Sequence, residues 1–90
     1  MVDSMSNELN PITGAQLRAA RALLRWSAEE LATRTKLGVA TIRRAEAHDA
    51  PLTTTAANSN AIRAALETAG IEFIPENGGG PGVRLKAKRQ

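Results

Sequence analysis

Apolar residues recur at helical spacing through most of the chain and alternate like a strand near its end. Spacings of three and four residues place the large apolar side chains on one face of each of four segments. These segments predict helices over about residues 14–25, 28–35, 39–48 and 55–69, with inward positions Leu17, Ala20, Leu24, Leu31, Ala32, Ile42, Ala45, Ile62, Ala65, Leu66 and Ala69. Whether residues 53–59 are helical stays open, because threonine, asparagine and serine are poor helix-interior residues.

The first two predicted helices begin with capping residues. Thr13 with Gln16, and Ser27 with Glu30, have the spacing of a capping box, in which side chains bond the free backbone N–H groups of a first helical turn. Both helix starts are therefore well defined by the sequence.

The turn between the second and third predicted helices allows two arrangements. Either Gly38 forms the turn, or Lys36 takes the left-handed turn position and Gly38 caps the third helix. Only the second arrangement buries both Leu37 and Ile42, so we favour it. Lys36 then accepts about 1 kcal/mol of left-handed strain, and Gly38 serves as a weaker N-cap than serine.

The last twenty residues have the pattern of a β element. The segments "IEFI" (71–74) and "VRLK" (83–86) alternate, and Asn77-Gly78 between them is a hairpin signal. A lone hairpin is marginal in water, and the alanine-rich helices offer little surface to cover its apolar face. We therefore expect residues 71–90 to join two chains as a homodimer. The alternative is a hairpin packed on its own helices.

These patterns divide the chain into three parts. Residues 1–12 are polar, end at Asn10-Pro11 and predict a flexible N-terminal arm. Residues 13–70 predict a compact helical domain, which Gly70 ends. Residues 71–90 form the β element with a basic tail, so the predicted fold class is mainly α with a short C-terminal hairpin.

Composition narrows the possible functions. The absence of cysteine excludes disulfides and thiolate metal sites, and a single histidine, His48, excludes a histidine-rich metal cluster. A catalytic site needs clustered titratable groups, and "NGGGPG" lacks the pattern of a phosphate loop, so we expect no enzyme, cofactor or metal. The chain has no apolar run of membrane-spanning length, and its first residues are polar and include acids. These features predict a cytoplasmic protein.

The positive charge is concentrated in the helical part. The formal net charge is +3 and the pI about 10.2. Residues 14–48 carry seven arginines and lysines against three glutamates. A basic domain of this kind favours a polyanionic partner such as nucleic acid.

Two capped helices joined by a tight turn, the second with outward arginines, are the pattern of a helix-turn-helix. The stretch "LRAARALLRWSAEELATRTKLGVATIRRAE" also resembles the phage-repressor-like (Xre-type) DNA-binding family, over about residues 13–69. The matching elements are "LR..R" in the first helix, "WSAEELA" at the second and "ATIRRAE" in the third. The resemblance implies a lambda-repressor-like fold and a sequence-specific regulator of transcription, a repressor, that reads the major groove of double-stranded DNA with its third helix.

The resemblance also implies roles for single residues. Arg44 occupies a base-reading position, where arginine can bond guanine bidentately. Val39 and Ala40 match base-contact positions at the start of the same helix. Arg21 and Glu46 match an ion pair between the first and third helices.

Phosphate contacts are expected beside the base-reading face. Arg43 lies to the side of that face, and Gly38, Thr41 and Lys36 complete the expected set. One departure is Ala28, because the family usually has a phosphate-contacting glutamine there. The alternative function is an antitoxin-type module that binds a toxin partner and represses its own operon.

Overall fold

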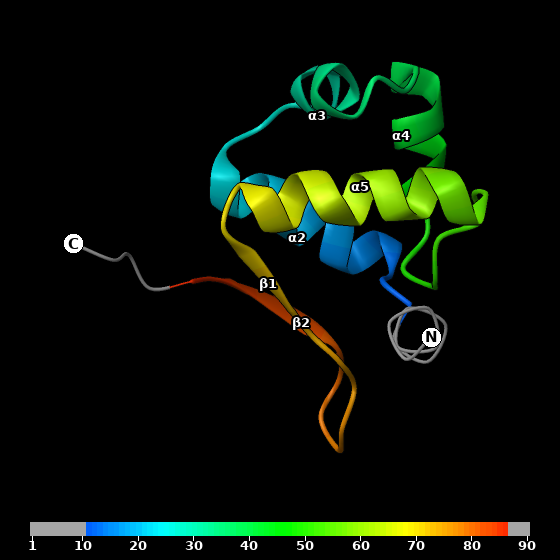
Figure 1. The fold of residues 1–90 in the computed structure, drawn as a ribbon. Helices are drawn as coiled ribbons and strands as arrows, with labels where there is room; N and C mark the ends of the chain where they lie inside the picture. Colours follow the sequence, from blue (N-terminus) through cyan, green and yellow to red (C-terminus); the bar gives the residue numbers. More distant parts are fainter. Residues whose placement is uncertain (1–10, 87–90) are drawn as a thin grey trace.

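The computed structural model describes residues 11–86, which form four helices and a two-stranded antiparallel sheet (Figure 1). In chain order these are α2 (Gly14–Leu24), α3 (Ala28–Thr35), α4 (Val39–Ala45), α5 (Ala56–Thr68), β1 (Ile71–Ile74) and β2 (Gly82–Leu85). The predicted mainly α fold with a C-terminal hairpin is therefore confirmed. Most of the predicted arm and the end of the basic tail lie outside the described residues. No helix within residues 11–86 has the length and apolar character needed to cross a bilayer.

The core draws on all four helices and on β1. Its most deeply buried side chains are Ile12, Leu17, Leu31, Ile42, Ile62, Leu66 and Ile71. Ile12 corrects the predicted boundary of the arm, because it is only 2% exposed. Its carbonyl also accepts a hydrogen bond from the Leu52 N–H at 3.2 Å. The helical domain therefore includes Ile12.

The capping box predicted at the start of α2 is present. The Thr13 hydroxyl accepts a hydrogen bond from the Gln16 N–H at 3.0 Å, and Gln16 Oε1 accepts one from the Thr13 N–H at 2.8 Å. At α3 the Ser27 hydroxyl accepts from the Glu30 N–H at 3.0 Å. The Glu30 carboxylate bonds Arg34 Nε at 2.8 Å, in place of the expected return bond to Ser27.

The turn between α3 and α4 has the arrangement that the sequence favours. Lys36 is left-handed, with φ 61° and ψ 29°, and Gly38 is extended directly before α4. Ile42 is fully buried, and Leu37 is half-buried against the core. Arg25, which follows α2, is a second left-handed residue at φ 59° that the sequence analysis does not anticipate.

Helix α4 is shorter than predicted and ends at Ala45, well before His48. The chain then turns back onto α2, where the Ala50 carbonyl accepts a hydrogen bond from the Gly14 N–H at 3.0 Å. The approach is so close that a Cβ on Gly14 would lie 1.8 Å from the His48 carbonyl oxygen. This return of the chain to α2 leaves no room for a further turn of α4.

Helix α5 begins at Ala56, so residues 56–59 are helical and residues 53–55 are not. Thr55 is its N-cap, and the Thr55 hydroxyl accepts a hydrogen bond from the Asn58 N–H at 3.1 Å. Gly70, at φ 108°, ends the segment as predicted. In Figure 1, α3 and α4 lie on one side of α5 and the hairpin lies on the other.

The hairpin packs on its own helices, which corrects the expectation that the helices could not cover it. Ile71 pairs with Leu85 across the two strands, and Phe73 pairs with Val83. Ile71 is fully buried, and Phe73 and Val83 pack against the core. Helix α5 contacts β1, and α2 contacts β2. Only Leu85 among these four side chains is exposed, at 46%.

The second strand and the hairpin loop also differ slightly from the prediction. Strand β2 covers residues 82–85 where the sequence predicts 83–86. The connection spans residues 75–81, with Gly78 left-handed at φ 104°. The Asn77-Gly78 pair therefore lies inside a longer loop and is not a two-residue turn.

Candidate nucleic-acid interface

An ion pair holds α4 against α2. The Arg21 guanidinium donates from Nε and Nη2 to the two carboxylate oxygens of Glu46, at 2.9 and 2.8 Å. The side chains are only 20% and 11% exposed. Arg21 Nη1 also donates to the Trp26 carbonyl at 2.8 Å. The pairing expected from the family resemblance is therefore present, and it fixes the end of α4 on α2.

A second arginine of α2 holds the chain that follows α4. Arg18 Nη1 donates to the Glu46 carbonyl oxygen, and Arg18 Nη2 pairs with the Asp49 carboxylate. Two of the cations that the sequence counts toward a basic surface are therefore used inside the molecule. The exposed arginines and lysines of residues 11–86 that make no ion pair are Arg25, Lys36, Arg44 and Lys86.

The residues of α4 range from fully buried to exposed. Ile42 and Ala45 are buried, whereas Ala40, Arg43 and Arg44 are exposed. Val39, a predicted base-contact residue, packs partly against the core. Its side chain is therefore less available for a partner than that of Ala40.

Arg43 is not a free cation. Its Nη2 donates to Glu29 Oε2 at 2.5 Å, and the two side chains are 56% and 64% exposed. A backbone hydrogen bond and the Arg43 guanidinium lower the pKa of the Glu29 carboxyl. Glu29 is thus a charged carboxylate at neutral pH, and Arg43 can reach a phosphate only by leaving it.

Arg44 differs from its neighbour, because its guanidinium has no ion-pair partner among residues 11–86. It borders a hollow of about 330 Å³ between α4 and the start of α5. That hollow is lined by Thr41, Arg44, Ala45, Thr53, Thr54, Thr55 and Asn58. It therefore combines one arginine with several hydroxyl groups, which can all bond an anion.

The sequence analysis missed the contribution of the loop before α5. Its signal is the run of three threonines at 53–55, which sequence alone could not bring next to α4. Thr41, predicted to contact phosphate, is half-buried in the same hollow. The structure thus groups Arg44 with hydroxyls from two separate segments.

The turn before α4 supplies further exposed groups. Gly38 is exposed and caps α4 without a side chain. Lys36 is exposed, and no ion pair within the described range involves it. Both predicted phosphate-contact residues are therefore accessible at the N-terminal end of α4.

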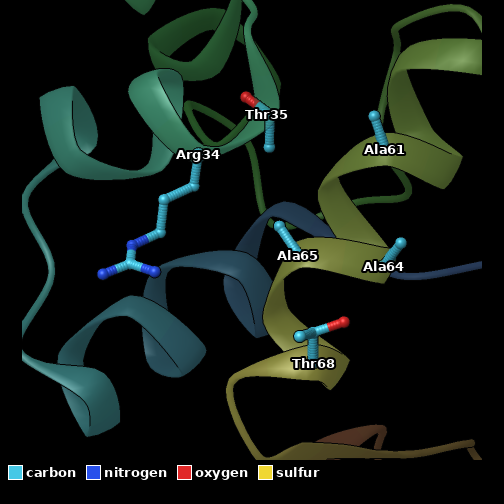
Figure 2. Close-up of a pocket in the computed structure, with 6 residues that line it drawn as sticks. All are labelled: Arg34, Thr35, Ala61, Ala64, Ala65 and Thr68. Atoms are coloured by element: carbon cyan, nitrogen blue, oxygen red, sulfur yellow. The ribbon is translucent and has the colours of Figure 1, made fainter.

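A second hollow, of about 400 Å³, lies between α3 and α5 and has a different chemical character (Figure 2). Its lining is mostly alanine and threonine: Arg34, Thr35, Ala61, Ala64, Ala65 and Thr68. The one cation, Arg34, is paired with Glu30 and lies 4.3 Å from the centre of the Trp26 ring. This hollow offers no cluster of titratable groups suited to acid–base chemistry.

Comparison with known proteins gives no family assignment. No model of a known protein family matches the chain, and no curated protein matches it. The features that bear on function are the geometry of α3, α4 and the loop before α5, together with the sequence resemblance.

Proposed function

We propose that this chain is a sequence-specific regulator of transcription, a repressor, that binds double-stranded DNA with α4 in the major groove. The helix-turn-helix formed by α3 and α4 is a suitable unit for this, because its second helix presents a short exposed face. The resemblance of residues 13–69 to the phage-repressor-like family supports the same function.

The observation that carries the proposal is the state of Arg44. It is exposed on α4, it lacks an ionic partner in the described part of the chain, and α4 is fixed to α2 by the Arg21–Glu46 pair. A preorganised, unpaired arginine on a helix can bond the O6 and N7 atoms of guanine without first breaking an internal pair. Hydroxyl groups beside it can bond backbone phosphates, which would set the position of the helix on the duplex.

Selection of binding sites from random duplex DNA tests this function. We expect enrichment of one sequence. The logarithm of the binding constant should fall by roughly 0.9 per log unit of salt for each phosphate contacted. The matched variant is Arg44→Ala in the same selection. Failure of the full chain to retain any duplex at low salt would contradict the proposal.

The proposed regulator acts as a dimer, because two recognition helices related by a two-fold axis can read two half-sites. The open edge of β2 is a suitable contact. The Lys86 N–H donates to the Gly70 carbonyl at 2.8 Å, which fixes the alternation of the hairpin hydrogen bonds. By this alternation, Val83 and Leu85 direct their backbone N–H and C=O groups away from β1. An edge of this kind can pair with the same strand of a second copy.

Sedimentation of the full chain at tens of micromolar tests the dimer. We expect a dimer for the natural sequence and a monomer for Leu85→Pro, because proline removes an outward N–H and leaves the hairpin's internal bonds in place. Leu85→Ala, which keeps that N–H, serves as the control and should stay dimeric. A monomeric natural chain, or a dimeric proline variant, would rule out this contact.

A further inference from the structure

The two neighbouring arginines of α4 are in different electrostatic states. Arg44 is unpaired within the described residues, whereas Arg43 bonds Glu29, which precedes it by 14 residues and belongs to the first turn of α3. The Glu29–Arg43 contact therefore joins α3 to α4 on their solvent side. It is not a local helix contact such as the Glu30–Arg34 pair of α3.

An exposed pair of this kind is easily opened, because water and salt screen both charges. A DNA phosphate is a competing anion for the same guanidinium. When phosphate takes Arg43, the Glu29 carboxylate loses its partner and lies close to a polyanion. When DNA binds through this face, Arg43 therefore exchanges the Glu29 carboxylate for a phosphate. The Glu29 carboxylate then repels the DNA.

We infer that Glu29 competes with DNA phosphates for Arg43 and so restrains the binding of any duplex, random or preferred. The inference rests on the proposed DNA-binding function. Binding to random duplex depends almost wholly on phosphate contacts, so the loss of one contact weakens it strongly. A preferred site also has base contacts, such as that proposed for Arg44, but it loses the same free energy with this phosphate contact, because the contact does not depend on base sequence.

The test compares Glu29→Gln with Glu30→Gln in titrations of random duplex and of the selected site over a range of salt concentrations. Both substitutions remove one negative charge from the first turn of α3 and break one exposed ion pair. We expect Glu29→Gln to bind random duplex about two- to five-fold more tightly at low salt. Its salt slope should be steeper by roughly 0.9, and its ratio of specific to random affinity should stay unchanged, because both duplexes gain the same contact.

A double-mutant cycle checks that Glu29 acts through Arg43. In an Arg43→Ala background, the effect of Glu29→Gln on the affinity and the salt slope should shrink to that of Glu30→Gln, which reflects only the removal of a negative charge near DNA. Equal effects of the Glu29 and Glu30 substitutions, or an undiminished Glu29 effect without Arg43, would overturn the inference. If the natural chain binds no duplex at all, the proposed function fails. If the natural chain binds DNA but Glu29→Gln has no effect, only the inference about Glu29 fails.

Discussion

Arginine side chains lie in two different environments, one at the junction between α2 and α4 and one on the outward face of α4. At the junction, Arg21 is largely buried and makes two bonds to Glu46 and a third to a backbone carbonyl. On the outward face, Arg44 is exposed and has no ionic partner in the described range. Arg43 lies between these extremes, since its partner Glu29 is itself exposed.

The difference shows that helical spacing alone does not separate buried, paired arginines from exposed, unpaired ones. The deciding factor is whether an acid lies within reach and whether water is excluded from the pair. A buried ion pair is costly to break, because the remaining charge stays in a poorly solvated place. An unpaired surface arginine keeps its hydrogen-bonding capacity for a partner.

The junction should be the most sensitive place in the molecule. Glu46→Ala leaves Arg21 without its buried partner, and we expect it to destabilise the fold by about 3–5 kcal/mol. Urea unfolding followed by circular dichroism measures this loss. Glu30→Ala, which breaks an exposed pair, should cost less than about 1 kcal/mol. Similar losses for the two variants would contradict the contrast between junction and surface.

The backbone contact at the junction should be nearly as sensitive. An added Cβ on Gly14 would lie 1.8 Å from the His48 oxygen, so α2 and the chain after α4 would have to move apart. We expect Gly14→Ala to cost about 2–3 kcal/mol. The control is Gly79→Ala, where a Cβ meets nothing within 4 Å. An unchanged thermal unfolding midpoint in the Gly14 variant would show that α2 and the chain after α4 can move apart at little cost.

The outward face should give the reverse result, a loss of binding without a loss of stability. We expect Arg44→Ala to lower affinity for the selected DNA site by about 1–3 kcal/mol and to relax base preference at one position. Its unfolding curve should match that of the natural chain. Arg25→Ala removes another exposed cation, and fluorescence titration should find little change at the selected site. Equal losses of affinity in the two variants would mean that Arg44 acts only as a general positive charge.

The smallest expected effect concerns the turn between the two helices. Lys36 is left-handed at φ 61° although it has a Cβ. Lys36→Gly should relieve this strain and stabilise the fold by about 0.5–1 kcal/mol. Denaturant midpoints would detect the gain, and Lys36→Ala, which keeps the Cβ, should show none. A destabilised glycine variant would mean that the lysine side chain contributes more than the strain costs.

The parts of the fold set by local pattern were predictable from the sequence. The choice of Lys36 as the turn residue follows from the spacing of Leu37 and Ile42, since both must face one core. The capping box of α2 follows from two residues three positions apart. Arg25 gives no such signal, because neither its type nor its neighbours mark a left-handed position.

The parts set by contacts between distant segments were not predictable. The early end of α4 depends on the chain returning to Gly14, and the pairing of Arg43 depends on a glutamate in another helix. The packing of the hairpin on its own helices was not predictable, because it depends on contacts of α5 with β1 and of α2 with β2. For the candidate site, Arg44 follows from helical position, whereas the threonine-lined hollow requires the loop before α5 to fold back beside α4.

Gln16 joins the start of α2 to the hairpin. Besides capping α2, its Nε2 donates to the carbonyl oxygens of Gly82 at 2.9 Å and Ile74 at 3.4 Å, where the two strands meet their loop. Gly14, two residues earlier, lies against the His48 carbonyl. The first turn of α2 therefore contacts both the hairpin and the chain that follows α4. One turn of helix thus sets the positions of two segments that lie far apart in the sequence.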